Sequence, residues 1–155
     1  MELSRWLRGV LLFIFACCLV LGAIAVPAEL RALTRASADF EPLQTGGLVF
    51  FWLSLLPVFA ALTLAWCIFT DIGRDESFSE KNARRLRAIS RLSLADTALY
   101  ALAAVSLAFW GLLRVYLPVF IAVIFLGIFL TIASAALSHL CHKAAALKSE
   151  NDLTI

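Results

Sequence analysis

Four long apolar runs, separated by short polar segments, dominate this chain. No charged residue occurs across 20 positions of Gly9–Ala28, 29 of Pro42–Thr70, 17 of Thr97–Leu113 and 24 of Val115–Ser138. A helix needs about 20 apolar residues to cross the hydrocarbon core of a bilayer. The backbone there must satisfy its own hydrogen bonds, so each run is expected to be a helix. The pattern predicts an all-α polytopic membrane protein with four transmembrane helices, at about 9–28, 47–69, 92–113 and 117–140.

Composition supports this reading and limits the function. Hydrophobic residues make up 63% of the 155 positions and charged residues 15%, whereas soluble domains carry about 25% charge. We therefore expect a single membrane domain over residues 1–155, with the lipid bilayer as its first partner. The net charge of +2 is too small to indicate direct binding of nucleic acid.

Three polar segments connect the predicted spans. Glu29–Gly46 lies between the first and second spans, and Asp71–Arg91 lies between the second and third. The last two spans are predicted to meet in a tight turn around Arg114 and Tyr116. Pro118 would then fall in the first turn of the fourth helix, where its missing N–H costs little.

The distribution of lysine and arginine predicts the orientation. The N-terminal stub, the central segment and the C-terminal tail carry ten of these residues, and the opposite side carries three. The positive-inside rule therefore places both termini and the central segment in the cytoplasm. Arg5, Arg8 and the small residues Ala23–Ala25 also resemble a cleavable signal peptide. The length of the first apolar run favours a retained span, and removal would leave the rest of the topology unchanged.

The central segment is the richest in candidate chemistry. Ser77 and Glu80 have the spacing of a capping box, which predicts a juxtamembrane helix from about Phe78. This helix should run into the third span, because no proline or glycine interrupts 77–110. Its basic side would bind anionic lipid, a cytoplasmic protein, or both. The arginines on that side are Arg84, Arg85, Arg87 and Arg91.

Asp96 is the acidic residue within an otherwise apolar span, and Ser93, Thr97 and Tyr100 share its side at helical spacing. A carboxylate within the membrane is a candidate for transport of protons or cations. The structural alternative is a carboxylate near the interface that reaches water or an arginine. We expect it to face inward or toward the cytoplasmic interface.

Small and metal-binding residues occur on the fourth span. Gly127, Thr131 and Ala135 recur every four residues, which indicates close helix packing. His139, Cys141 and His142 end the span on the same predicted side as Cys67 and Asp71, so a metal site of mixed ligands is one alternative. The other is that the histidines suit the negative end of the helix dipole. No CxxC or HExxH motif and no catalytic motif is present, so we expect no bound metal, no cofactor and no enzymatic activity.

Two stretches carry a resemblance to a known family. The segment Gly73–Ile89, which reads GRDESFSEKNARRLRAI, and the closing Leu147–Ile155, which reads LKSENDLTI, resemble the central loop and terminal signature of the YoaS-like family of bacterial membrane proteins (domain of unknown function 2975). Ser77 stands where that family often has proline. The resemblance covers four spans around these motifs and nearly the whole chain.

The resemblance implies a multi-pass protein of the bacterial plasma (inner) membrane without assigned catalysis. Members are often encoded beside a small helix-turn-helix regulator, which suggests a non-enzymatic regulatory protein that binds such a cytoplasmic partner. One alternative is a small transporter or channel subunit, which would use Asp96 and assemble as a homo-oligomer. Another is an immunity or stress-protection protein of the membrane.

Overall fold

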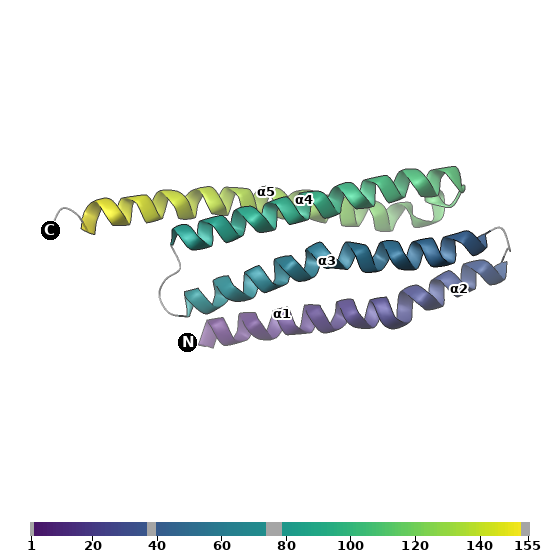
Figure 1. Cartoon of the computed structure of the whole chain (residues 1–155), viewed down its shortest axis with the longest axis horizontal. Coiled ribbons are helices and arrows are strands. Elements are labelled where there is room, and N and C mark those ends of the chain that lie inside the picture. Colours follow the sequence, from purple (N-terminus) through teal and green to yellow (C-terminus); the bar gives the residue numbers. More distant parts are fainter. Residues whose placement is uncertain (1, 37–39, 74–78, 153–155) are drawn as a thin grey trace.

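Helices account for almost all of the computed structural model, which describes residues 2–36, 40–73 and 79–152 (Figure 1). The elements in chain order are α1 (Glu2–Val20), the π-helix η1 (Leu21–Ala25), α2 (Val26–Ala36), α3 (Glu41–Ile72), α4 (Glu80–Phe109) and α5 (Leu113–Asp152).

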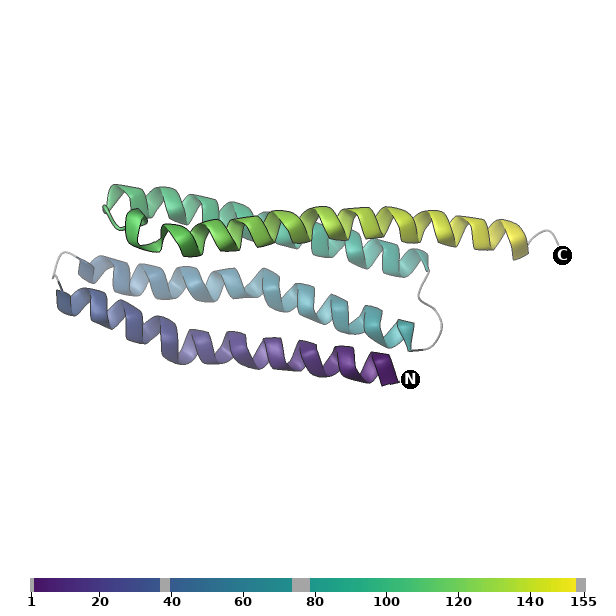
Figure 2. The ribbon, with the colours of Figure 1, turned by 180° about the vertical axis from the view of Figure 1, so that it is seen from behind.

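The helices form a row of antiparallel rods rather than a closed bundle (Figures 1 and 2). α1, η1 and α2 make up the first rod, which packs against α3; α3 packs against α4, and α4 makes its most extensive contact with α5. Both termini and the α3–α4 connection lie at one end, which we call the termini end. The other end, at the α4–α5 turn, is the Gly111 end. This arrangement is compatible with the predicted topology, and the side of the membrane on which this end lies stays a prediction.

The distribution of exposed and buried side chains in the row is that of a membrane protein rather than of a water-soluble one. Among the described residues, four helical stretches are long and apolar enough to cross a bilayer: Arg5–Ala36, Leu43–Ile72, Glu80–Phe109 and Leu113–Leu147. Large apolar side chains point outward, with Phe109 87% and Phe125 72% exposed. The buried polar side chains of the described residues are Ser54, Asp71, Asn82, Ser90, Ser93, Thr97, Ser134 and Ser138. The fold is thus the predicted all-α protein with four transmembrane helices.

The first span is longer than predicted. The polar segment expected at 29–46 is mostly helical, because α2 continues to Ala36 and α3 begins at Glu41. Residues Glu29–Ala36 contain no glycine or proline that would end the helix. η1 lies just before Pro27, and the Val26 N–H bonds to the carbonyl of Leu21, five residues back. A π-turn of this kind changes the register between α1 and α2 without ending the rod.

The last two helices meet earlier than predicted. Gly111 has φ +71°, and its N–H bonds to Ala108 O at 3.1 Å. The next N–H, of Leu112, bonds to Leu107 O at 3.1 Å. These two bonds define a Schellman motif, whose left-handed residue is usually glycine. The turn predicted around Arg114 and Tyr116 is therefore wrong: both belong to the first turn of α5, and Pro118 lies one turn further inside.

α4 begins at a different serine from the predicted one. Ser79 is extended and its hydroxyl accepts from the Asn82 N–H at 3.3 Å, so it caps a helix that starts at Glu80. Ser77 and Phe78 lie outside the described residues. The helix then continues to Phe109, as predicted from the lack of breakers. Residues 80–91 are the first turns of α4, and the structure does not show them as a separate juxtamembrane helix.

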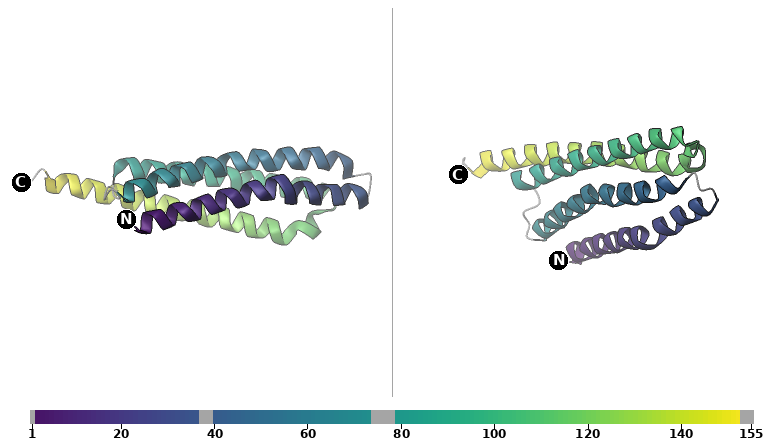
Figure 3. Two further views of the ribbon diagram at one scale, coloured as in Figure 1. Left: turned by 90° about the horizontal axis from the view of Figure 1, so that it is seen from below. Right: turned by 45° about the vertical axis from the view of Figure 1, so that its right-hand side comes forward.

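α5 extends beyond its neighbours. Its 40 residues span about 60 Å at 1.5 Å per residue, twice the ~30 Å hydrocarbon core. Figure 3 shows its C-terminal part projecting past the other helices at the termini end. Part of α5 therefore lies outside the hydrocarbon layer.

Candidate functional site

The α4–α5 interface is held by hydroxyl groups. Three serines each donate to a backbone carbonyl of the opposite helix: Ser138 to Ala83 at 2.7 Å, Ser90 to Thr131 at 2.9 Å and Ser93 to Gly127 at 3.0 Å. Such interhelical bonds stabilise membrane proteins by about 0.6 kcal/mol each. Two members of the predicted small-residue row thus take part, whereas the third, Ala135, is exposed.

α4 and α5 approach each other closely at Gly127. A Cβ added there would overlap the Thr97 hydroxyl oxygen, so a side chain does not fit without movement. The Thr97 hydroxyl itself donates to Ser93 O at 2.7 Å. Ser93, predicted to share a side of the helix with Asp96, therefore bonds across to α5. Thr97, on the same predicted side, bonds to the backbone of its own helix and packs against Gly127.

Asp96 lies near the middle of α4 and is half-buried. Its Oδ1 atom is buried and has no hydrogen-bond partner among the described residues. No described arginine forms an ion pair with it. Ser93 and Thr97 lie nearby on the same helix, but their hydroxyl groups donate hydrogen bonds to backbone carbonyls and not to this carboxylate.

Tyr100 joins three helices instead of supporting Asp96. Its hydroxyl lies 3.3 Å from the Ser54 hydroxyl of α3. Its ring meets Phe50 of α3 edge-on at 5.4 Å and Phe120 of α5 at 6.0 Å, measured between ring centroids. The predicted polar side therefore divides into a packing pair, a half-buried carboxylate and an aromatic junction.

The predicted row of arginines also divides. Arg85 is half-buried, and its guanidinium donates to Asp71 Oδ2 of α3 at 2.5 Å and to Asn82 Oδ1 at 2.9 Å. Asp71 is 7% exposed and Asn82 is fully buried. This cluster joins the end of α3 to the start of α4. Sequence reasoning did not identify Asp71 as the partner of an arginine, because 14 positions and a change of helix separate the two.

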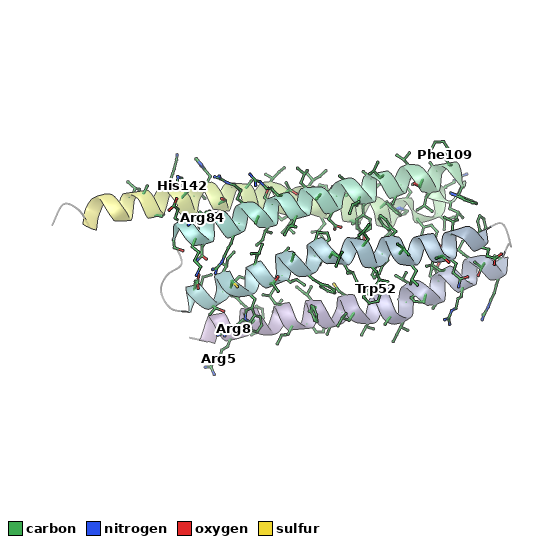
Figure 4. The ribbon with its side chains drawn as sticks, viewed as in Figure 1. Arg5, Arg8, Trp52, Arg84, Phe109 and His142 are labelled. Carbon is green, nitrogen blue, oxygen red and sulfur yellow. The ribbon has the colours of Figure 1, made fainter. Side chains whose placement is uncertain are left out.

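The other three arginines form an exposed strip that we call the basic face: Arg84, Arg87 and Arg91. Their spacing of three and four residues places them on one side of α4. No described residue forms an ion pair with them. The bond between Ser138 and Ala83 brings the adjoining part of α5 alongside, and Figure 4 shows Arg84 and His142 at this same end.

The histidines do not form a metal centre with the residues proposed from the sequence. His139 and His142 are exposed, whereas Cys141 is buried. Among the described residues, no three histidine, cysteine, aspartate or glutamate side chains gather closely enough to hold a metal ion. At the same end, the Arg8 guanidinium lies 5.8 Å from the centre of the Trp66 ring, a cation–π contact between α1 and α3.

A cavity of about 460 Å³ lies near the Gly111 end, between α2, α3, α4 and α5. Its walls are mostly apolar and include Leu30, Gly47, Phe50, Tyr100, Leu107 and Phe120. Two polar residues that also line it, Glu29 of α2 and Tyr116 of α5, are joined by a hydrogen bond of 3.1 Å from the tyrosine hydroxyl. The sequence does not predict this cavity, because its lining residues come from four helices and form no local sequence motif.

A protein-family model described as "Protein of unknown function (DUF2975)" matches residues 28–155. This match starts within the first rod, just before Glu29, and covers α3, α4 and α5 in full. No curated protein and no solved structure matches the chain.

Proposed function

Because the chain belongs to this family of proteins of unknown function, we propose a role for it from its own geometry. The protein is a non-enzymatic regulatory component of the bacterial plasma membrane. Its termini end faces the cytoplasm, where the basic face binds a small protein with an acidic surface, such as a helix-turn-helix regulator.

The observation that carries this proposal is the division of the arginines. Arg85 is held in a buried ion pair and stabilises the fold, whereas Arg84, Arg87 and Arg91 are exposed on one side of α4. Exposed arginines with planar, multiple donors suit recognition of carboxylates on a partner. The ten-to-three distribution of basic residues supports a cytoplasmic position for this end.

Helix lengths support access to a soluble partner. α4 has 30 residues and a length of about 45 Å, so about 15 Å exceeds the hydrocarbon core. With the Gly111 turn at the opposite boundary, the excess falls on the first ten residues or so of α4, which include Arg84 and Arg87. The part of α5 near Ser138 lies beside the start of α4, and the projecting part beyond it offers further helix surface to a docked protein (Figure 3).

The test is direct binding between two purified proteins. The membrane protein is placed in nanodiscs of zwitterionic lipid and titrated with a purified small helix-turn-helix protein that has an acidic surface. Replacing Arg84, Arg87 and Arg91 with glutamine should weaken binding about tenfold or more, because charge-assisted contacts of 1.5–3 kcal/mol each are lost. The matched control replaces Arg31, Arg35 and Arg114, the exposed arginines of the other end, and should bind like the wild type.

Equal affinity of both triple variants would contradict docking at the basic face. The lipid alternative has a separate signature. If the arginines serve only to contact anionic headgroups, each contributes about 1 kcal/mol of interface binding, and the glutamine variant loses no protein partner in any lipid.

A second function is favoured by one observation, the buried Oδ1 of Asp96 without a described partner. A carboxylate in this state within a membrane helix suits transient binding of a proton or cation by a small transporter or channel subunit. Asp96→Asn should then abolish pH-dependent flux in proteoliposomes while melting behaviour is retained. Unchanged flux, or no flux in the wild type, would contradict this role.

A further inference from the structure

We infer that the cavity near the Gly111 end is a binding site for a lipophilic organic cation. Its volume of about 460 Å³ lies within the range of small-molecule sites, about 300–1,000 Å³. It is formed where η1 and α2 bring the first rod over α3, and where α5 returns from the Gly111 turn. The site lies away from the basic face and does not rest on the proposed function.

The walls have the chemistry that an aromatic cation needs. Phe50, Tyr100 and Phe120 line the cavity and hold one another through edge-on ring contacts. The Tyr100–Ser54 contact fixes the tyrosine hydroxyl against α3. Aromatic side chains fixed in this way bind an apolar body and attract positive charge with their ring faces.

The charge of the site determines the sign of its ligand. Glu29 lines the cavity and is exposed, and its Oε1 accepts only a neutral donor, the Tyr116 hydroxyl. No described cation forms an ion pair with it, although Arg31 and Arg35 lie on the same helix and Arg114 lies on α5. An acyl chain would gain nothing from this carboxylate, and an anion would be repelled. A molecule with a cationic centre and apolar rings satisfies both the carboxylate and the walls.

The probe is tetraphenylphosphonium, measured by equilibrium binding to the full chain in zwitterionic nanodiscs. Glu29→Gln removes the charge and keeps the hydrogen-bond acceptor, so affinity should fall about tenfold. Glu41→Gln, an exposed carboxylate that does not line the cavity, is the control and should bind normally. Ala103→Trp places a large side chain in the cavity and should abolish binding, whereas Ala101→Trp on the exposed side of α4 should not.

Neutral triphenylphosphine oxide separates charge from shape. The wild type should bind this neutral compound at least tenfold more weakly than it binds the cation. The affinity of Glu29→Gln for the neutral compound should equal that of the wild type. If Ala103→Trp abolishes the binding of both compounds and Glu29→Gln leaves both affinities unchanged, the site is apolar and does not select for charge. That result would overturn the inference. So would the absence of any saturable binding to the wild type. Because Glu29 is exposed, Glu29→Gln should fold normally. The inference can therefore be tested even if Ala103→Trp fails to fold.

Discussion

At the residue scale, the ion pair between Arg85 and Asp71 is the clearest example of charged side chains that stabilise the fold. Both side chains are mostly buried, and Asn82 supplies a further acceptor for the guanidinium. Burial of two ions costs free energy that their attraction only partly offsets. Removing one partner leaves the other without compensation, and this makes the pair more important to stability than a surface pair.

The first prediction follows from this imbalance. Arg85→Leu should lower the free energy of unfolding by about 3 kcal/mol, because it leaves Asp71 buried and unpaired. The exposed Arg84→Leu should change it by less than about 0.5 kcal/mol. Denaturant unfolding in micelles, followed by circular dichroism, measures both.

A double variant isolates the cause. Asp71→Leu with Arg85→Leu removes the stranded charge and should recover most of the lost stability. If Arg85→Leu unfolds at the same denaturant concentration as Arg84→Leu, the ion pair has no structural role.

The sequence allowed some of these assignments and not others. Helical spacing placed Ser93, Thr97 and Tyr100 near Asp96, yet their hydrogen bonds go to Gly127, to the local backbone and to Ser54. The direction of a hydroxyl depends on which helix packs against it. Single-chain periodicity does not contain that information, so only the side of the helix could be predicted.

At the element scale, the α4–α5 pair depends on the absence of a side chain at Gly127. The two helices approach so closely there that even a methyl group would overlap the Thr97 hydroxyl. The serine-to-carbonyl bonds at Gly127 and further toward the termini end require a short separation, because a hydroxyl reaches only a nearby backbone.

The second prediction concerns this approach. Gly127→Ala should destabilise the protein by about 1–3 kcal/mol, since overpacking forces the helices apart. Gly9→Ala is the matched control: an added Cβ meets nothing within 4 Å there, and stability should not fall. Thermal unfolding in detergent gives the comparison. Adding Thr97→Ala to Gly127→Ala should restore part of the loss, and a double variant no better than the single one would refute the overlap.

The existence and type of every spanning helix could be predicted from the length of the uncharged runs. Their ends could not be predicted as well. Charge alone predicts a polar segment after Ala28, yet α2 continues to Ala36, because charged side chains are compatible with a helix that leaves the hydrocarbon layer. The position of Arg114 between two uncharged runs predicts the turn there, whereas the left-handed Gly111 ends α4 three residues earlier.

At the scale of the whole molecule, both termini lie at the same end of the row as the end of α3 and the start of α4 (Figure 1). Only two orientations in the membrane are therefore possible, with this end facing either the cytoplasm or the outside. The charge distribution predicts that this end faces the cytoplasm. A reporter must be exposed to test this, and Asn82 is unsuitable because it is fully buried. Lys81 and Glu41 are exposed and lie at opposite ends of the row.

The third prediction is therefore one of accessibility. In a chain whose four native cysteines are replaced, Glu41→Cys should react with a membrane-impermeant maleimide in intact cells. Lys81→Cys should react only after the inner membrane is opened. The reverse pattern would invert the topology and place the basic face outside the cell.

The row arrangement has a consequence for how the chain is assembled. α3 and α4 form the junction between two helical hairpins, one ending at Gly73 and the other beginning at Ser79. Among the described residues, the Asp71–Arg85 bridge and the Tyr100–Ser54 contact join α3 to α4, and the Tyr116–Glu29 hydrogen bond joins α5 to α2. The hairpins are thus separable modules joined by side chains as much as by peptide bonds. Co-expressed as fragments 1–76 and 77–155, they should associate in the membrane and co-purify. Fragments carrying Arg85→Leu together with Tyr100→Leu should remain apart, while the same substitutions in the unbroken chain should still allow insertion.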